Sequence, residues 1–143
     1  MNFQRLALIG CGLMGGSFAL ALRQAGLVQH ITGFSASEKT RQRAVELRVI
    51  DQACSSVAEA VLGADLVLLA VPVGAMHSSF VALRDSLSPT ALLMDVGSTK
   101  CDVIAAAKAS LGYGIIGRTI NEPCKPSEKD RSDRRWRIWS GHI

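Results

Sequence analysis

Residues 6–22, with the sequence LALIGCGLMGGSFALAL, constrain the fold of this chain more than any other stretch. Apolar residues lead directly into a turn with glycines at positions 10, 12 and 15, and a segment rich in Ala and Leu follows. This pattern predicts a buried strand, a tight turn and a helix that begins inside the turn. A dinucleotide-binding unit has this arrangement, because the backbone N–H groups and the helix dipole can meet a pyrophosphate there.

We expect each glycine of the turn to have its own role. Gly10 lets the chain reverse, Gly12 lets the backbone approach a pyrophosphate without a Cβ in the way, and Gly15 lets helix and strand pack closely. These three residues, together with Leu13 and Met14, are predicted to bind a cofactor. The alternative is an ordinary turn between a strand and a helix.

Strand and helix patterns alternate along the following residues. The first helix is expected to end near Gly26. Further strands are expected at 31–34, 65–71 and 91–95, and further helices at 39–47, 57–62, 75–83 and 101–110. Continuous apolar runs such as 65–71 are typical of parallel strands buried on both faces. The sequence therefore predicts an α/β fold, a doubly wound parallel sheet with right-handed crossovers.

Ligands of such sheets bind beyond the carboxyl ends of the strands, where the strand order reverses. The loops at 10–15, 35–37, 71–74 and 97–100 are therefore expected around one cleft. Val71 and Pro72, at the end of an apolar strand, join the predicted cofactor-binding residues on this ground.

The end of the second strand indicates which dinucleotide the chain prefers. An Asp or Glu there would accept hydrogen bonds from both ribose hydroxyls and repel a 2′-phosphate. This chain has Ser35 at that place, Ser37 beyond it and Lys39 close behind, with Arg41 and Arg43 further along. Hydroxyl groups and cations favour NADP, with NAD as the alternative. The cations could instead be the solvated face of a helix.

Composition excludes several classes of function. The net charge of +4 is divided into +1 for residues 1–116 and +3 for residues 117–143, so it does not indicate a nucleic-acid partner. The four cysteines show no paired spacing and no nearby histidine, so we expect free thiols and no metal site. The longest strongly apolar run, 66–71, is too short to cross a membrane. A cytoplasmic protein is expected.

Three stretches taken together resemble the prephenate/arogenate dehydrogenase family. They are GCGLMGGSFALAL, DLVLLAVPV and, most specifically, DVGSTK, and the resemblance covers residues 1 to about 112. Residues 48–51, RVID, also resemble the family, although Arg48 stands where the family usually has Gly. A different NAD(P)-dependent reductase, such as a β-hydroxyacid dehydrogenase, would need a catalytic lysine on a later helix, which this sequence lacks.

The resemblance implies a reaction and a substrate. Such enzymes transfer a hydride from a cyclohexadienyl ring to NAD(P)+, and loss of the ring carboxylate as CO2 aromatises the product. Ser98 of DVGSTK is similar to a family residue that hydrogen-bonds the ring hydroxyl and the catalytic His, and it could also cap the following helix. The family dimerises through an all-helical second domain.

The sequence departs from the family after residue 112. Glu122 stands where the resemblance places the catalytic His, and an unperturbed Glu is a weak base near neutral pH. We expect a dinucleotide-binding domain at 1–116 and an irregular basic tail at 117–143, with no helical second domain. A reading-frame change or truncation is one interpretation of the tail, and an evolved short paralogue is the other. The resulting hypotheses are an impaired dehydrogenase and a non-catalytic NAD(P)-binding or interaction module.

Overall fold

The computed structural model describes residues 2–97 and 100–111. Within these ranges, strands and helices alternate as follows: β1 (Phe3–Ile9), α1 (Leu13–Gln24), β2 (Val28–Phe34), α2 (Glu38–Glu46), β3 (Gln52–Ala53), α3 (Val57–Val61), β4 (Leu66–Leu69), α4 (Val73–Leu83), β5 (Leu92–Asp95) and α5 (Lys100–Leu111). The strands form one parallel sheet in the order β3-β2-β1-β4-β5. The predicted doubly wound parallel α/β fold is confirmed.

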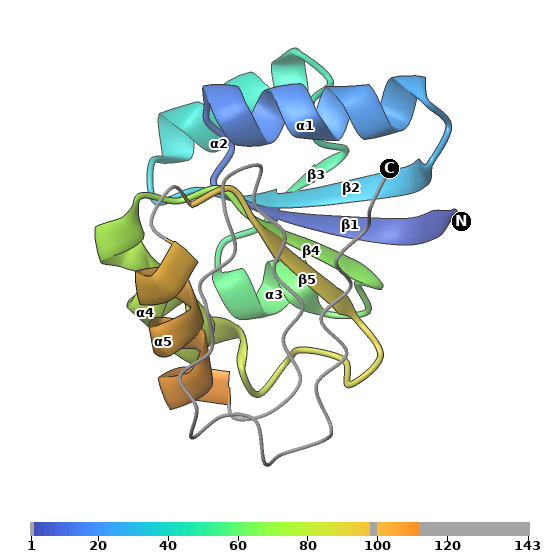
Figure 1. Ribbon diagram of the computed structural model, residues 1–143. Helices are drawn as coiled ribbons and strands as arrows, with labels where there is room; N and C mark the ends of the chain where they lie inside the picture. Colours follow the sequence, from blue (N-terminus) through green and yellow to red (C-terminus); the bar gives the residue numbers. More distant parts are fainter. Residues whose placement is uncertain (1, 98–99, 112–143) are drawn as a thin grey trace.

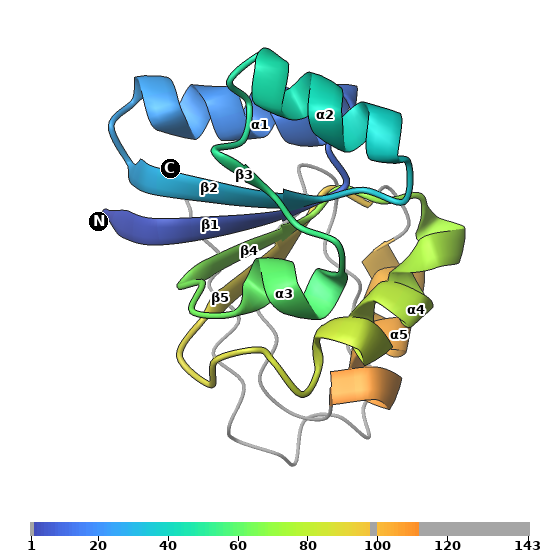
Figure 2. The same ribbon diagram turned by 180° about the vertical axis from the view of Figure 1, so that it is seen from behind.

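Helices cover both faces of this sheet. Figure 1 shows α1 and α2 on one face and α3, α4 and α5 on the other, and Figure 2 shows the same layers from behind. The central strand β1 supplies both layers with core residues, because successive side chains of a strand point to opposite faces. Leu6 and Leu8 pack in the layer under α1 and α2, whereas Ala7 and Ile9 pack in the layer over α3 to α5.

The strand order reverses between β1 and β4. From β1 the chain moves outward through β2 to β3, then returns across the sheet to β4 and continues to β5. The carboxyl ends of β1 and β4 lie side by side, with Ile9 paired to Leu69. This is the switch point at which ligands of such sheets bind.

Several strand boundaries differ from those predicted. The second strand begins at Val28 rather than residue 31, because Val28 pairs with Phe3 at the start of β1. His30 therefore lies inside a strand instead of before it. The strand expected over 65–71 is confined to 66–69. The two-residue edge strand β3 was not predicted, and it forms by pairing Gln52 with Thr32.

The helix boundaries agree more closely with the prediction. Helix α2 begins one residue earlier than expected, with Ser37 as its N-cap, and α4 begins at Val73 rather than residue 75. Ser56 caps α3, and the Glu59 carboxylate accepts from the N–H of Ser55, one residue before the N-cap, in a variant of the capping box. No helix in the described residues is long and apolar enough to cross a bilayer.

Helices α1 and α2 end in the same hydrogen-bonded motif. After α1, the N–H groups of Gly26 and Leu27 donate to carbonyls of the last turn, and after α2 the N–H groups of Arg48 and Val49 do so. The motif needs a left-handed residue after the cap. That residue is Gly26 (φ +68°) in the first case and Arg48 (φ +54°) in the second.

Arg48→Gly is therefore expected to stabilise the fold. A left-handed conformation costs a residue with a Cβ about 1–2 kcal/mol, and the greater freedom of glycine in the unfolded chain offsets part of the gain. We expect a net gain of about 0.5–1 kcal/mol in urea unfolding. Gly26→Ala is the matched control, because its Cβ would meet nothing within 4 Å. It should destabilise the fold, and a loss of stability in Arg48→Gly would contradict this account.

Candidate functional site

The glycine turn between β1 and α1 lies at the switch point of the sheet. A Cβ on Gly10, whose φ is +99°, would lie 2.3 Å from the backbone oxygen of Ala70. A Cβ on Gly15 would lie 2.3 Å from the Gly10 oxygen and 2.9 Å from Cδ1 of Leu8. A Cβ on Gly12 would meet nothing within 4 Å. Two glycines are thus needed for packing, whereas Gly12 faces open space.

The amino end of α1 is open to an anion. Gly12 is its N-cap, no side chain of residues 2–97 or 100–111 caps it with a hydrogen bond, and its first turn holds no acidic residue. In α2 and α3, by contrast, Ser37 and Ser56 fill the capping position with their hydroxyls. The free N–H groups and the positive dipole end of α1 therefore favour a negatively charged group beside Gly12.

Three backbone hydrogen bonds hold the ends of four neighbouring strands together at this edge. The Gly10 N–H donates to the Phe34 carbonyl (2.8 Å), the Ala70 N–H donates to the Ile9 carbonyl (2.7 Å), and the Val96 N–H donates to the Leu69 carbonyl (3.1 Å). Each bond continues the pairing of adjacent strands by one residue. The loops that follow β1, β2, β4 and β5 therefore begin side by side, as the predicted single cleft requires.

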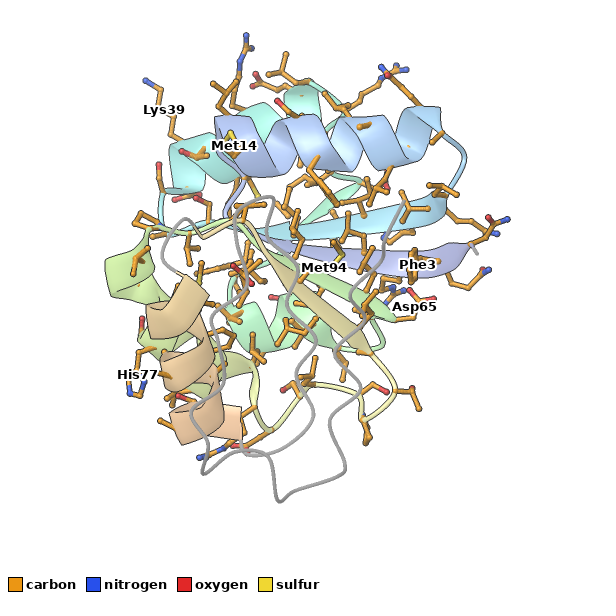
Figure 3. The ribbon with its side chains drawn as sticks, in the orientation of Figure 1. Phe3, Met14, Lys39, Asp65, His77 and Met94 are labelled. Atoms are coloured by element: carbon orange, nitrogen blue, oxygen red, sulfur yellow. The ribbon has the colours of Figure 1, made fainter. Side chains whose placement is uncertain are left out.

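The cofactor-binding residues predicted within α1 are exposed. Leu13 is 86% exposed and Met14 65%, so two large apolar side chains lie open at the start of the helix. Figure 3 shows Met14 there. Across the switch point, Val71 is half-buried and Pro72 is the exposed N-cap of α4. Leu13 and Met14 thus follow Gly12 at the start of α1, and Val71 and Pro72 lie between β4 and α4.

Cys11 fills the space beneath the glycine turn. Its side chain is buried, and its Sγ lies 3.5 Å from the Phe34 carbonyl oxygen. Burial raises the pKa of the Cys11 thiol to about 11, while the charge of Arg41 acts in the opposite direction and Cys54 adds to the rise. The thiol is therefore protonated at neutral pH and places no negative charge next to an incoming phosphate.

The residues predicted at the end of β2 occupy different positions. Ser35 directly follows the strand and is half-buried. The Ser37 hydroxyl accepts from the Thr40 N–H at 3.3 Å as the cap of α2, so one of its lone pairs is used. Lys39 is exposed, and Figure 3 shows its side chain extending outward from α2. Among the described residues it makes no ion pair.

Arg41, which was not among the predicted site residues, is turned inward. Its guanidinium donates to the Ser35 carbonyl and lies 5.8 Å from the centre of the Phe34 ring. Arg43, further along α2, instead pairs with Glu46 on the exposed face of the helix, 2.9 Å away. The sequence indicates three positively charged residues on this helix, but the direction in which each side chain points depends on tertiary packing.

A groove of about 510 Å³ runs between α1 and α2. Its apolar lining includes Leu20, Leu47 and Val49, and Gly12 and Lys39 also line it. The groove is therefore continuous with the space beside the glycine turn.

The loop after β5 is tightly held where it leaves the sheet. The buried Asp95 carboxylate accepts from the Gly97 N–H at 3.0 Å, and a Cβ on Gly97 would lie 2.8 Å from Cγ2 of Val103. This loop leads toward Ser98. Ser98 and Glu122 lie outside the described residues. In the described part of the chain, no three His, Cys, Asp or Glu side chains gather in a way that could hold a metal ion.

A doubly wound parallel sheet with this glycine turn at its switch point defines a nucleotide-binding domain of the Rossmann class. Residues 18–119 match the family model described as "Prephenate dehydrogenase, nucleotide-binding domain". The chain therefore belongs to the prephenate dehydrogenase family. The matched range begins within α1, so it does not include Gly10 or Gly12.

Individual relatives agree with the family match. The cyclohexadienyl dehydrogenase of Zymomonas mobilis is 36% identical over 114 residues, which are 80% of this chain and 39% of the relative. The structure of Aquifex aeolicus prephenate dehydrogenase in complex with hydroxyphenyl propionate and NAD+ is 31% identical, with a TM-score of 0.75 over 82% of this chain and 41% of that one.

Synechocystis arogenate dehydrogenase is also similar in structure. It is 31% identical, with a TM-score of 0.71 over 80% of this chain and 40% of that one. The chain thus spans about two fifths of the length of these three relatives.

Proposed function

We propose that this chain forms the cofactor-binding part of an NAD(P)-dependent dehydrogenase that oxidises prephenate or arogenate. The observation that carries the proposal is the open space at Gly12, directly in front of the uncapped amino end of α1. The family and the relatives named for prephenate, cyclohexadienyl and arogenate dehydrogenases supply the reaction. Dimerisation, which the family resemblance implies, stays a prediction.

In this proposal the glycine turn holds the pyrophosphate. The first-turn N–H groups of α1 donate to it, and Gly12 allows the backbone to approach without a Cβ. Leu13 and Met14 contact the dinucleotide from one side of the cleft, and Val71 and Pro72 contact it from the other. The side chains on both sides are largely apolar, so they exclude water from the bound cofactor.

The substrate end of the proposal rests on the family resemblance. When bound, NAD(P)+ accepts a hydride from the cyclohexadienyl ring, and the ring carboxylate leaves as CO2 to give an aromatic product. From the resemblance of DVGSTK to the family, Ser98 is assigned to hydrogen-bond the ring hydroxyl. Glu122 takes the place of the family's base, and a carboxylate is a weaker base than imidazole near neutral pH.

We also propose that the chain prefers NADP to NAD. Ser35 stands at the end of β2, where a carboxylate would repel a 2′-phosphate, and its hydroxyl can donate to that phosphate. Capping uses the Ser37 hydroxyl only as an acceptor, so its O–H can donate to the phosphate. Lys39 adds a positive charge, but its contribution is small because exposed charges are well screened.

Ser35→Asp should move the preference from NADP toward NAD by at least tenfold, which corresponds to about 1.4 kcal/mol. The new carboxylate would repel the 2′-phosphate and accept hydrogen bonds from the ribose hydroxyls. The measurement is a pair of dissociation constants for each variant at one ionic strength.

Ser37→Asp is the matched control for Ser35→Asp. It adds the same charge two residues away, and Asp caps a helix as well as Ser does. A smaller shift in the control would tie the effect to position 35. A parent chain that binds NAD more tightly than NADP would contradict the assignment of Ser35.

A further inference from the structure

The three positively charged side chains of α2, Lys39, Arg41 and Arg43, differ in exposure and in the residues that they contact. Lys39 and Arg43 are exposed, and Arg43 pairs with Glu46 of its own helix. Arg41 is half-buried, although it lies between them in the sequence. Among the described residues of α2, Arg41 is the cation that hydrogen-bonds to the loop after β2, whereas Lys39 and Arg43 line the groove between α1 and α2.

Two contacts fix the Arg41 guanidinium at the end of β2. It donates to the Ser35 carbonyl, and it lies 5.8 Å from the centre of the Phe34 ring. Its charge also opposes the rise in the pKa of the Cys11 thiol. The two groups that it contacts are the last residue of β2 and the first residue of the loop that follows. The guanidinium therefore lies at the end of β2, and its charge reaches Cys11 of the glycine turn.

The hydrogen-bonding capacity of this guanidinium is only partly used. A guanidinium has five N–H donors in a planar fork that suits the oxygens of a phosphate. In the described part of the chain, the acceptor that Arg41 meets is the Ser35 carbonyl. Donors remain for a ligand, and the contacts with Ser35 and Phe34 hold the side chain in place before one binds.

We propose that Arg41 is the specificity-determining cation of this site and that it binds the 2′-phosphate of NADP beside Ser35. The proposal rests on the proposed function, because it assumes that the adenosine ribose lies at the end of β2. It assigns Arg41 a larger share of the selectivity than Lys39. An anchored, half-buried guanidinium loses less freedom on binding and is screened less by salt than an exposed, flexible lysine.

The test compares Arg41→Ala, Arg41→Lys and Lys39→Ala by calorimetric titration with NADP and with NAD. Arg41→Ala should weaken NADP binding at least tenfold and NAD binding less than threefold. Arg41→Lys should recover part of the loss, because it restores the charge without the planar fork. Lys39→Ala should change NADP binding less than threefold.

The salt dependence of binding further distinguishes the contributions of Arg41 and Lys39. In the parent chain, the preference for NADP should persist between 0.1 M and 0.5 M salt if the half-buried Arg41 supplies it. A preference that disappears at 0.5 M salt and in Lys39→Ala, while Arg41→Ala retains it, would overturn the proposal.

Two further outcomes have distinct meanings. Equal weakening of NADP and NAD in Arg41→Ala, with no recovery in Arg41→Lys, would show that Arg41 only shapes the loop, and it would overturn the specificity role. If the parent chain binds neither dinucleotide, that result would instead contradict the proposed function itself. Thermal melts of each variant establish that it is folded before it is titrated.

Discussion

Gly12→Val is expected to abolish dinucleotide binding and leave the fold intact. The two effects separate because a Cβ at this position would meet nothing within 4 Å, so valine fits the folded chain. Its branched side chain would nevertheless occupy the space in which we place the pyrophosphate, in front of the first-turn N–H groups of α1. We expect at least a hundredfold loss of affinity for both NADP and NAD, about 2.7 kcal/mol.

The measurement for Gly12→Val pairs calorimetric titration with a thermal melt. Gly12→Ala is the graded control, because it adds one methyl group at the same place and should weaken binding by a smaller factor. Ser17→Ala lies on the same helix and should bind like the parent. If Gly12→Val melts like the parent and still binds NADP with the parent's affinity, the glycine turn does not hold the cofactor.

Gly15→Val should have the opposite pattern, with loss of the fold itself. Its Cβ would lie 2.3 Å from the Gly10 oxygen, 2.8 Å from Cβ of Ala70 and 2.9 Å from Cδ1 of Leu8. The Gly10 oxygen belongs to the turn that directly follows the central strand β1, and it cannot move aside without breaking the packing of α1 on β1. We expect a loss of about 3 kcal/mol or more in the free energy of unfolding, at the upper end of overpacking effects.

Gly16→Ala is the matched control for Gly15→Val. It changes the next residue of the same helix, where a Cβ would lie 3.5 Å from Cγ1 of Val49, an ordinary contact. Replacing a helical glycine with alanine should stabilise the chain by about 0.5–1 kcal/mol. Urea unfolding measures both variants. A Gly15→Val chain as stable as the parent would show that helix and strand do not need this close approach.

Much of the fold could be predicted because its strongest patterns are local. The apolar run at the centre of β4 and the glycine turn after β1 determine the central strands and the switch point without knowledge of distant residues. The edge strand β3 could not be predicted in this way. It has two exposed residues, and it exists because Gln52 and Ala53 pair with the neighbouring β2.

The site was predicted less completely because it depends on side-chain directions. The sequence indicates cations at 39, 41 and 43, yet helical spacing alone does not tell which of them contacts the loop after β2. Arg41 does so because Phe34 and the Ser35 carbonyl receive its guanidinium. The capping role of Ser37 has a local signal, because a serine just before a helix commonly accepts from an N–H of the first turn.

The most direct test of the central claim is calorimetric titration of the unmodified 143-residue chain with NADP and with NAD. The account predicts saturable binding of both dinucleotides at a single site, with the tighter binding for NADP. Absence of binding to either dinucleotide at millimolar concentration, in a sample shown by a cooperative melt to be folded, would contradict it.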